Sequence, residues 1–353
     1  MYNKTGEIPL DINSIKAALA LITDHGGVPY ITAQPGIGKS DCVKQFAQAR
    51  ADKMGLGFYE GPENYDPAKM GFLDLRLATI DSIDLSGLPI IDKTNECTQF
   101  TRSPYIPNDG HGVLFLDELP QAKAGNQAAV SQLILDKRVG THALGKNWVI
   151  VAAGNRTQDR AATHKMPTHI SNRLTTLELE FSLEAFVDYM HDEDTHEAAI
   201  AFAKYRPDTL ESFKPDEAIN CTPRSFISAS NYIDAPDDLQ FNLMSGTIGE
   251  GATAEFLGFT KIYMNLPPLE EFLAKPKTIA IPEAADVLFA TIQLLSHNVQ
   301  TDNVEKMANF IDRLSDAPER QVQFWRAAVV RNKKIAMSKP FTKFVGSNQD
   351  LIL

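Results

Sequence analysis

The spacing of apolar residues divides the chain into two parts with different periods. Up to about residue 181, short apolar runs and strict alternation predict buried strands. The predicted strands cover 28–32, 73–78, 113–116, 148–153 and 177–181. Beyond residue 181, apolar residues recur at helical spacing to the end of the chain. We therefore expect an α/β part followed by an all-helical part.

Helical segments alternate with the predicted strands. Asp11 is a predicted N-cap, and the helix that follows it should end at Gly26 and Gly27. Further helices are predicted from residue 39 to about 54, from 121 to 136, and just before Arg173. Beyond residue 181 the predicted helices cover 183–191, 194–206, 222–233, 250–263, 283–297, 303–314 and 318–335. This alternation is typical of an α/β fold built on a parallel sheet.

Residues 81–112 fit neither period. Gly, Pro, Asn and Asp are dense here, which favours an inserted hairpin or mobile loop; the alternative is a plain surface connection. At about thirty residues the stretch exceeds the usual length of a connection, which favours a functional role. We expect the part near 81–106 to contact a partner and to lie outside the core. A small hairpin is predicted at 137–147, around Gly140 and Gly145.

Composition places the chain among ordinary globular proteins. Of its 353 residues, 43% are hydrophobic and 22% charged, and no apolar run approaches the length of a membrane span. The N-terminus lacks the basic and then apolar order of a signal peptide. The three cysteines are scattered and predict neither disulfides nor a zinc site. We expect a cytoplasmic protein without a membrane partner.

Charge is unevenly distributed along the chain. The net charge is -11, residues 178–197 hold eight acidic residues and no Lys or Arg, and residues 319–344 hold seven basic residues against one Glu. An acidic body argues against broad nucleic-acid binding, and only the basic tail leaves it open. The tail is otherwise a solvated helix face or a partner for the acidic stretch. His191 and His196 are five residues apart, which favours a polar helix junction over a metal site.

Residues 33–40 form a glycine-rich turn between a predicted strand and a predicted helix. Gly36 and Gly38 permit backbone turns that a Cβ would obstruct, so that successive N–H groups can point at phosphate oxygens. The N-terminus of the next helix adds its dipole. In such a loop Lys39 reaches the β and γ phosphates, and the Ser40 hydroxyl is a ligand for Mg²⁺.

Ala33 occupies the position where the phosphate-loop pattern has its first glycine. Alanine is the smallest substitute, so we retain the interpretation. The predicted nucleotide-binding residues are Gln34, Pro35, Gly36, Ile37, Gly38, Lys39, Ser40 and Asp41.

Polar residues follow two further buried strands. Asp117 and Glu118 end the apolar run 113–116, at the edge where α/β proteins bind ligands. Asp117 would hold Mg²⁺ through water, and Glu118 would polarise the water that attacks the γ phosphate; a helix cap is the structural alternative. Asn155 ends the next strand and would orient the same water, or simply form a turn.

This order of motifs resembles the AAA+ ATPases, and more narrowly the MoxR branch, which includes bacterial and phage-encoded members. The narrower resemblance rests on Asp84-Leu85-Ser86-Gly87-Leu88-Pro89, on the hairpin at 137–147 and on Thr222-Pro223-Arg224-Ser225. It covers about residues 10–265. It implies a P-loop NTPase parallel sheet sandwich (AAA+ core) at 1–181, a helical lid at 182–265 and a helical C-terminal extension at 266–353.

The resemblance also implies roles for individual residues. Asn155 corresponds to sensor 1 and Arg224 to sensor 2, while Arg173 is the arginine finger for the neighbouring subunit. Arg160 is its rival, and Arg102 and Arg156 are weaker candidates.

The implied activity is hydrolysis of Mg-ATP at the subunit interfaces of a homo-oligomer, expected to be a hexameric ring. It would drive chaperone-like remodelling or metal insertion in a partner that carries a von Willebrand factor A domain. Two alternatives remain: a DNA-acting AAA+ ATPase of the replication, restriction or transposition type, and an ATP-dependent scaffold that hydrolyses weakly.

Overall fold

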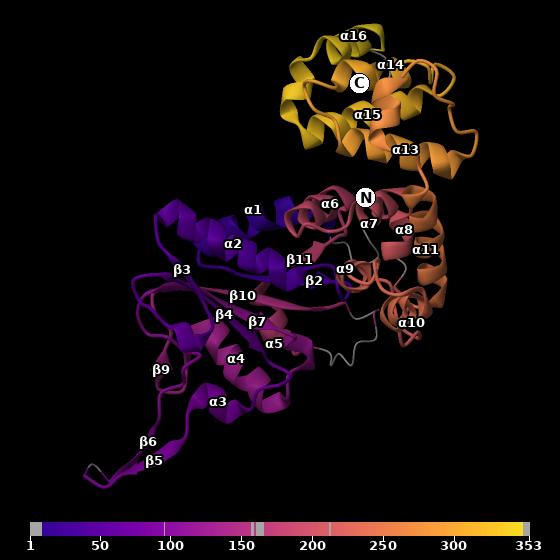
Figure 1. Ribbon diagram of the computed structural model, residues 1–353. Coiled ribbons are helices and arrows are strands. Elements are labelled where there is room, and N and C mark those ends of the chain that lie inside the picture. The colour runs from indigo at the N-terminus through magenta and orange to yellow at the C-terminus, as the bar shows by residue number, and fades with distance from the viewer. Residues whose placement is uncertain (1–8, 95, 157–158, 160–165, 212, 349–353) are drawn as a thin grey trace. The chain divides into compact units, whose positions relative to one another are not determined.

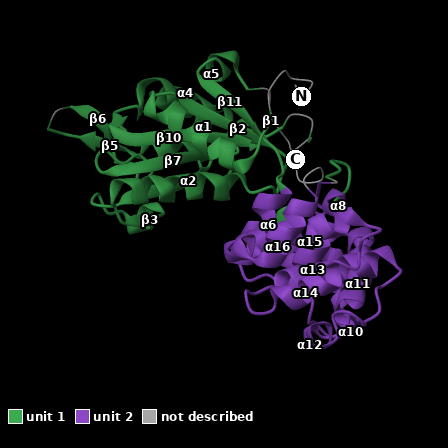
Figure 2. Cartoon of the chain, turned by 90° about the horizontal axis from the view of Figure 1, so that it is seen from above, with its two compact units in different colours: residues 1–182, 213–218, 222–224 green, residues 183–212, 219–221, 225–353 purple. Residues whose placement is uncertain are grey.

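The computed structural model describes residues 9–94, 96–156, 159, 166–211 and 213–348 (Figure 1). The chain forms two compact units (Figure 2). The first contains residues 1–182, 213–218 and 222–224, and the second contains the remainder.

A seven-stranded sheet forms the centre of the first unit, and all of its strand pairs are parallel. The strands, in spatial order, are β1 (Pro9–Leu10), β11 (Leu174–Leu179), β2 (Val28–Ala33), β10 (Asn147–Asn155), β7 (His111–Asp117), β4 (Met70–Arg76) and β3 (Phe58–Glu60). Because the strands are parallel, their carboxyl ends lie at one edge of the sheet. Residues that follow different strands are brought together there.

Helices cover both faces of this sheet (Figure 1). On one face, α1 (Ile12–Asp24) and α2 (Lys39–Met54) pack in a core that includes Ile31, Phe72 and Phe115. The opposite core includes Leu133 and Ile134 of α4 (Ala124–Asp136), with α3 (Ser82–Ser86) and α5 (Thr168–Ser171) on the same side. The predicted α/β fold with a parallel sheet between helices is confirmed.

Local signals in the sequence set several element boundaries. The Asp11 side chain accepts a hydrogen bond from the Ser14 N–H at 2.7 Å, as expected of an N-cap, and α1 ends before the predicted glycines. Helix α2 ends at Met54 and is capped by Gly55, whose φ of 66° is left-handed. Helix α4 begins at Ala124 instead of residue 121, because Pro120 lies in a separate 3₁₀ turn, Leu119–Gln121. The short edge strands β1 and β3 were not predicted.

The stretch at 81–112 contains α3 and an antiparallel hairpin of β5 (Pro89–Asp92) and β6 (Cys97–Phe100). All residues of the two hairpin strands except Asp92 are exposed, in agreement with the predicted insert. The expectation that the whole of 81–106 lies outside the core is wrong at both ends. Leu85 is fully buried because α3 packs against α4, and Ile106 is fully buried in the same core. The predicted hairpin at 137–147 is present as β8 (Arg138–Val139) and β9 (His142–Ala143).

The described residues of the second unit form helices and no strands, as the change of period predicted. The helices are α6 (Leu183–Asp192), α7 (Glu197–Tyr205), α8 (Pro207–Glu211), α9 (Pro223–Ser230, whose first two residues belong to the first unit), α10 (Asp237–Ile248), α11 (Glu250–Met264), α12 (Leu269–Ala274), α13 (Ala285–His297), α14 (Val304–Ile311), α15 (Pro318–Arg331) and α16 (Lys339–Ser347). Helices α8, α10, α12 and α16 were not predicted. In α10 the apolar Leu239, Phe241 and Leu243 are at least 40% exposed, which weakens the helical spacing of its buried residues.

Aromatic contacts join the segments of this unit. Phe259 of α11 stacks on Tyr205 of α7, and both contact Phe289 of α13, so helices from either side of residue 265 share one core. The basic segment 319–344 forms α15, a 3₁₀ turn (Lys333–Met337) and most of α16, which pack around Trp325. None of the helices in the described part of the chain has both the length and the apolar character needed to cross a lipid bilayer.

Candidate nucleotide-binding site

The glycine-rich loop connects the end of β2 to the start of α2. Gly36 and Gly38 have φ angles of 79° and 93°, the left-handed region that favours glycine. Ala33 is the fully buried last residue of β2 and pairs with Asn155 of β10. It lies in extended backbone, so a methyl group is tolerated where the motif usually has glycine.

Gly36 also permits a close approach by a distant segment. A Cβ at this position would lie 2.5 Å from the Thr222 hydroxyl oxygen. The Arg224 N–H donates a hydrogen bond to the Gly36 carbonyl at 3.1 Å. The glycine therefore lets residues 222–224 contact the loop directly, and this contact brings the side chain of Arg224 to the site.

Lys39 is the cation at the centre of the site. Its ammonium donates hydrogen bonds to the carbonyls of Ala33 and Gln34, both at 3.2 Å, and to Asn155 Oδ1 at 2.8 Å. Burial lowers the pKa of Lys39 to about 8, although the nearby Asp117 and Asp159 act in the opposite direction. At pH 7, which is below this value, the positively charged form of the side chain predominates.

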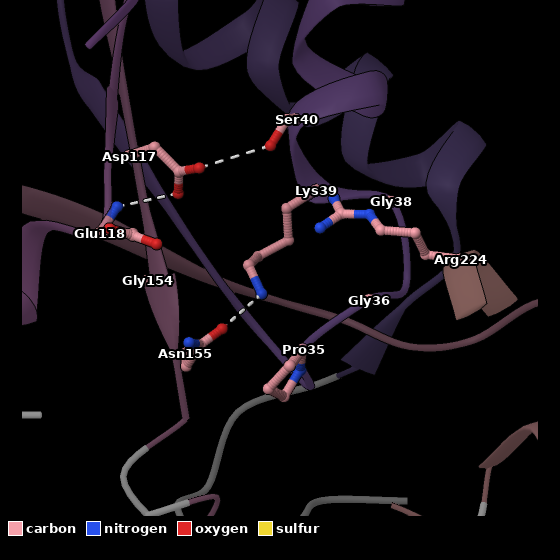
Figure 3. Close-up of a pocket in the computed structure, with 10 residues that line it drawn as sticks. All are labelled: Pro35, Gly36, Gly38, Lys39, Ser40, Asp117, Glu118, Gly154, Asn155 and Arg224. Carbon is pink, nitrogen blue, oxygen red and sulfur yellow. Dashed lines mark hydrogen bonds between the residues drawn. The ribbon is translucent and has the colours of Figure 1, made fainter. Parts of the chain in front are cut away.

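Asp117 and Ser40 face each other across the site. The Ser40 hydroxyl donates a hydrogen bond to Asp117 Oδ2 at 3.4 Å, and the other carboxylate oxygen accepts one from the Glu118 N–H at 2.8 Å (Figure 3). A hydroxyl and a carboxylate side by side are oxygen donors of the kind that Mg²⁺ prefers. The residues present therefore fit this metal.

Glu118 has an unusual backbone conformation. Its φ of 56° and ψ of 35° place the residue in the left-handed region, which residues other than glycine and asparagine seldom occupy. This conformation directs the chain away from β7 directly after Asp117. Strained residues of this kind cluster at functional sites, where the surrounding structure holds them.

These groups line one cleft at the carboxyl edge of the sheet (Figure 3). Its lining consists of Pro35, Gly36, Gly38, Lys39, Ser40, Asp117, Glu118, Gly154, Asn155 and Arg224. The remaining predicted nucleotide-binding residues do not line it. Gln34 and Ile37 belong to the loop, and Asp41 lies in the first turn of α2.

The predicted arginines lie in different places. Arg224 extends from the start of α9 toward Lys39 (Figure 3). Arg173 precedes β11, and since Leu174 pairs with Val28, it lies at the amino edge of the sheet, on the order of 15–20 Å from the loop after β2. It is exposed and donates to the Ser131 hydroxyl at 3.5 Å. Arg102 is exposed outside the cleft, and Arg160 lies outside the described residues.

Some residues near the site were not predicted. Asp74 is an acidic residue that follows four apolar or small residues of β4, and this contrast could have indicated it as a candidate. Burial, and then the neighbouring Asp117, raise the pKa of Asp74 to about 6. Asp159 and Glu178 had no local signal, because only the fold brings them to the Arg156 side chain beside the loop. Thr222 was noted only as part of the motif at 222–225, and its contact with Gly36 was not predicted.

No protein-family model matches the chain, and a search of curated proteins gives no match either. Among solved structures, NtrX from Brucella abortus is 12% identical, with 92% of this chain and 69% of that chain covered and a TM-score of 0.41. The same protein in complex with ADP is 15% identical, with 92% and 68% covered and a TM-score of 0.40. A single-residue mutant of RuvB from Thermotoga maritima is 14% identical, with 76% and 78% covered and a TM-score of 0.37. TM-scores below 0.5 do not define a family.

Proposed function

We propose that the protein is a P-loop ATPase that binds Mg-ATP in the cleft at the carboxyl edge of its sheet. The observation that carries this proposal is the convergence of Lys39, Ser40, Asp117, Glu118 and Asn155 on one cleft from three neighbouring strand ends. A cation, a carboxylate with a hydroxyl, and a second carboxylate are the groups that phosphoryl transfer to water requires.

We further propose that it is an AAA+ ATPase of the MoxR branch. The motif order and the exposed β5–β6 hairpin support this proposal, as does Arg224 at the start of α9. The proposed assembly is a homo-oligomeric ring, with six subunits as the expectation, in the cytoplasm. Its proposed partner carries a von Willebrand factor A domain and is remodelled, or loaded with metal, at the expense of ATP.

Ser40 and Asp117 would hold the Mg²⁺ ion, which neutralises charge on the β and γ phosphates when bound. Lys39 binds the same phosphates with its ammonium group. Glu118 accepts hydrogen bonds from the attacking water and polarises it, and Asn155 orients that water from the next strand. Arg224 adds positive charge beside Gly36, where residues 222–224 contact the loop.

Loss of function at one carboxylate tests the proposal. Glu118→Gln should leave ATP binding intact and lower the turnover number by on the order of 10²-fold or more, because the amide is a poor base. Lys39→Ala should abolish binding, since the loop then lacks its phosphate-binding cation. Turnover and ATP binding are measured separately, by phosphate release and by calorimetry. Normal turnover in Glu118→Gln would show that Glu118 does not activate the water.

The DNA-acting alternative rests on the basic segment 319–344, in which Arg326, Lys333 and Lys334 are exposed. Binding to duplex DNA at two salt concentrations tests it. A nucleic-acid surface should bind DNA with an affinity that falls steeply with salt. The scaffold alternative predicts that Glu118→Gln changes nothing, because a scaffold does not need this carboxylate.

A further inference from the structure

One arginine bridges the carboxyl ends of three neighbouring strands. Arg156 follows β10, Gln34 follows β2 and Glu178 lies near the end of β11, and β2 is the middle strand of the three. The sheet register pairs Asn155 with Ala33 and Glu178 with Thr32, so these strand ends lie level with one another. The Arg156 side chain therefore crosses the end of β2, where the phosphate loop begins.

The guanidinium contacts a different group on each side. Its Nε and Nη2 donate to the two carboxylate oxygens of Asp159 at 3.1 and 3.2 Å, a bidentate pair. Nη1 donates to Glu178 Oε1 at 3.5 Å, and Nη2 also donates to Gln34 Oε1 at 3.4 Å. The side chains of Asp159 and Glu178 are only 5% and 9% exposed.

This arrangement differs from a surface ion pair. Charged groups this deeply buried persist only when they are paired, and here two carboxylates share one guanidinium. A planar group with five donors can serve three partners at once, whereas an ammonium group lacks that geometry. Arg156 is therefore committed within its own subunit and is not available as a finger for a neighbour.

We propose that Arg156 is a positioning residue of the ATPase, which keeps the strand end that carries Asn155 in fixed register with the phosphate loop. The inference rests on the proposed function. Arg156 acts on Lys39 by two routes: through Gln34, whose carbonyl accepts a hydrogen bond from Lys39, and through the adjacent Asn155, whose side chain accepts another. A shift at either end would change the position of the ammonium group relative to Asn155 and the attacking water while the group remains at the phosphate loop.

The test must separate positioning from folding. Removal of Arg156 alone leaves two buried carboxylates unpaired and is strongly destabilising. The principal variant is therefore the neutral triple substitution Arg156→Met, Asp159→Asn and Glu178→Gln, and the second variant is Arg156→Lys. Arg50→Met is the matched control, because Arg50 pairs with Asp24 at 2.7 Å near the far end of α2, away from the cleft.

We expect the triple variant to lose on the order of 10-fold to 100-fold in kcat, because small displacements of reacting groups have effects of this size. Its Kd for ATP should change by less than about threefold, since the phosphate-binding groups remain present. The kcat of Arg156→Lys should fall between the values for the triple variant and the wild type. The kcat of Arg50→Met should equal that of the wild type. Gln34→Ala should lower kcat less in the triple variant than in the wild type, because the two changes break the same link.

Hydrogen exchange gives a readout that does not depend on activity. The backbone amides of residues 34–38 should exchange faster in the triple variant than in the wild type or in Arg50→Met. Unchanged exchange together with an unchanged kcat would overturn the inference while the ATPase proposal stands. Absence of ATPase activity in the wild type would overturn the proposed function instead, and the exchange rates would still decide whether Arg156 holds the loop.

Discussion

At the scale of single residues, Glu118 connects backbone strain with the proposed chemistry. A left-handed residue with a side chain costs about 1 kcal/mol or more, and glycine avoids that cost. We predict that Glu118→Gly raises the free energy of unfolding by about 0.5 to 1 kcal/mol, after the greater chain entropy of glycine is subtracted, and abolishes turnover. Chemical denaturation and a phosphate-release assay measure the two effects.

Lys137 provides the matched control for this prediction. It has nearly the same backbone conformation, with φ of 54°, but lies at the end of α4 outside the cleft. Lys137→Gly should stabilise the protein to a similar degree without loss of activity. A Glu118→Gly variant that is less stable than the wild type would show that its surroundings do not store strain.

Gly36 is required at its position for two independent reasons. Its φ is positive, and a Cβ would collide with Thr222. We predict that Gly36→Ala weakens ATP binding by at least about tenfold, because the loop and residues 222–224 must move apart. Gly246→Ala, inside α10 with open space around it, should leave binding unchanged. Equal calorimetric affinities for the two variants would contradict the assigned contact.

At the scale of elements, His191 of α6 joins the long helices of the second unit. Its ring stacks on His297 of α13, and its Nδ1 lies 3.4 Å from the Arg331 guanidinium of α15. The environment matches the expected polar helix junction. Among the described residues, no group of three His, Cys, Asp or Glu side chains is arranged to hold a metal. Burial, together with Lys204 and Arg331, lowers the pKa of His191 to about 4.

This lowered pKa predicts how stability depends on pH. Between the ordinary histidine pKa of 6.5 and about 4, the unfolded chain binds a proton at His191 that the folded chain does not bind. This residue should therefore make the protein less stable as pH falls through that range. The His191→Gln variant should lose less of its free energy of unfolding than the wild type as pH falls, which is measured by denaturation at several pH values. Identical slopes would exclude the assigned protonation state.

The β5–β6 hairpin is the element we expect to contact a partner. Ile91 is 80% exposed and Leu88 is 58% exposed. An isolated two-stranded hairpin is only marginally stable in water, so a partner that covers these apolar side chains would stabilise it. The Thr101 N–H donates to the Leu88 carbonyl at 2.8 Å, so a Gly-Ser turn in place of residues 89–100 would close the chain without strain. We predict that this deletion keeps ATP binding and impairs engagement of the partner.

A wider deletion is the control for the hairpin. Replacement of residues 81–106 removes the buried Leu85 and Ile106 and should destabilise the α/β unit. Thermal unfolding distinguishes the two variants. If the shorter deletion also unfolds the protein, the hairpin contributes to the core.

At the scale of the whole molecule, Arg173 tests whether activity depends on assembly. It lies at the edge of the sheet opposite the phosphate loop, so it cannot reach the phosphates of its own site. We predict that Arg173→Ala subunits bind ATP but hydrolyse it poorly, and that mixing them with Lys39→Ala subunits restores part of the activity. Each restored site would combine an intact phosphate loop with Lys39 from one subunit and an intact Arg173 from the other.

Co-assembly of the two variants must first be established by light scattering or crosslinking. Mixed oligomers without recovered phosphate release would mean that Arg173 has a structural role or acts within its own subunit. Arg160 would then be the next arginine to examine by the same mixing experiment.

The sequence by itself determined the features that depend on local chemistry and period. The change from strand to helical spacing gave the α/β part and the helical part, and the glycine pattern with Lys39 and Ser40 located the loop. These signals are local because a helix, a buried strand or a tight turn restricts the residues within a few positions of it.

Tertiary structure alone decided which distant residues meet at the loop. The order of the strands places Arg156 over β2 and beside Glu178, and the return of the chain brings Thr222 against Gly36. Tertiary packing buries Leu85 and Ile106 in one core, although the composition of the segment between them resembles a surface loop. Such contacts depend on how parallel strands are connected through helices, and no spacing within a single segment encodes that order.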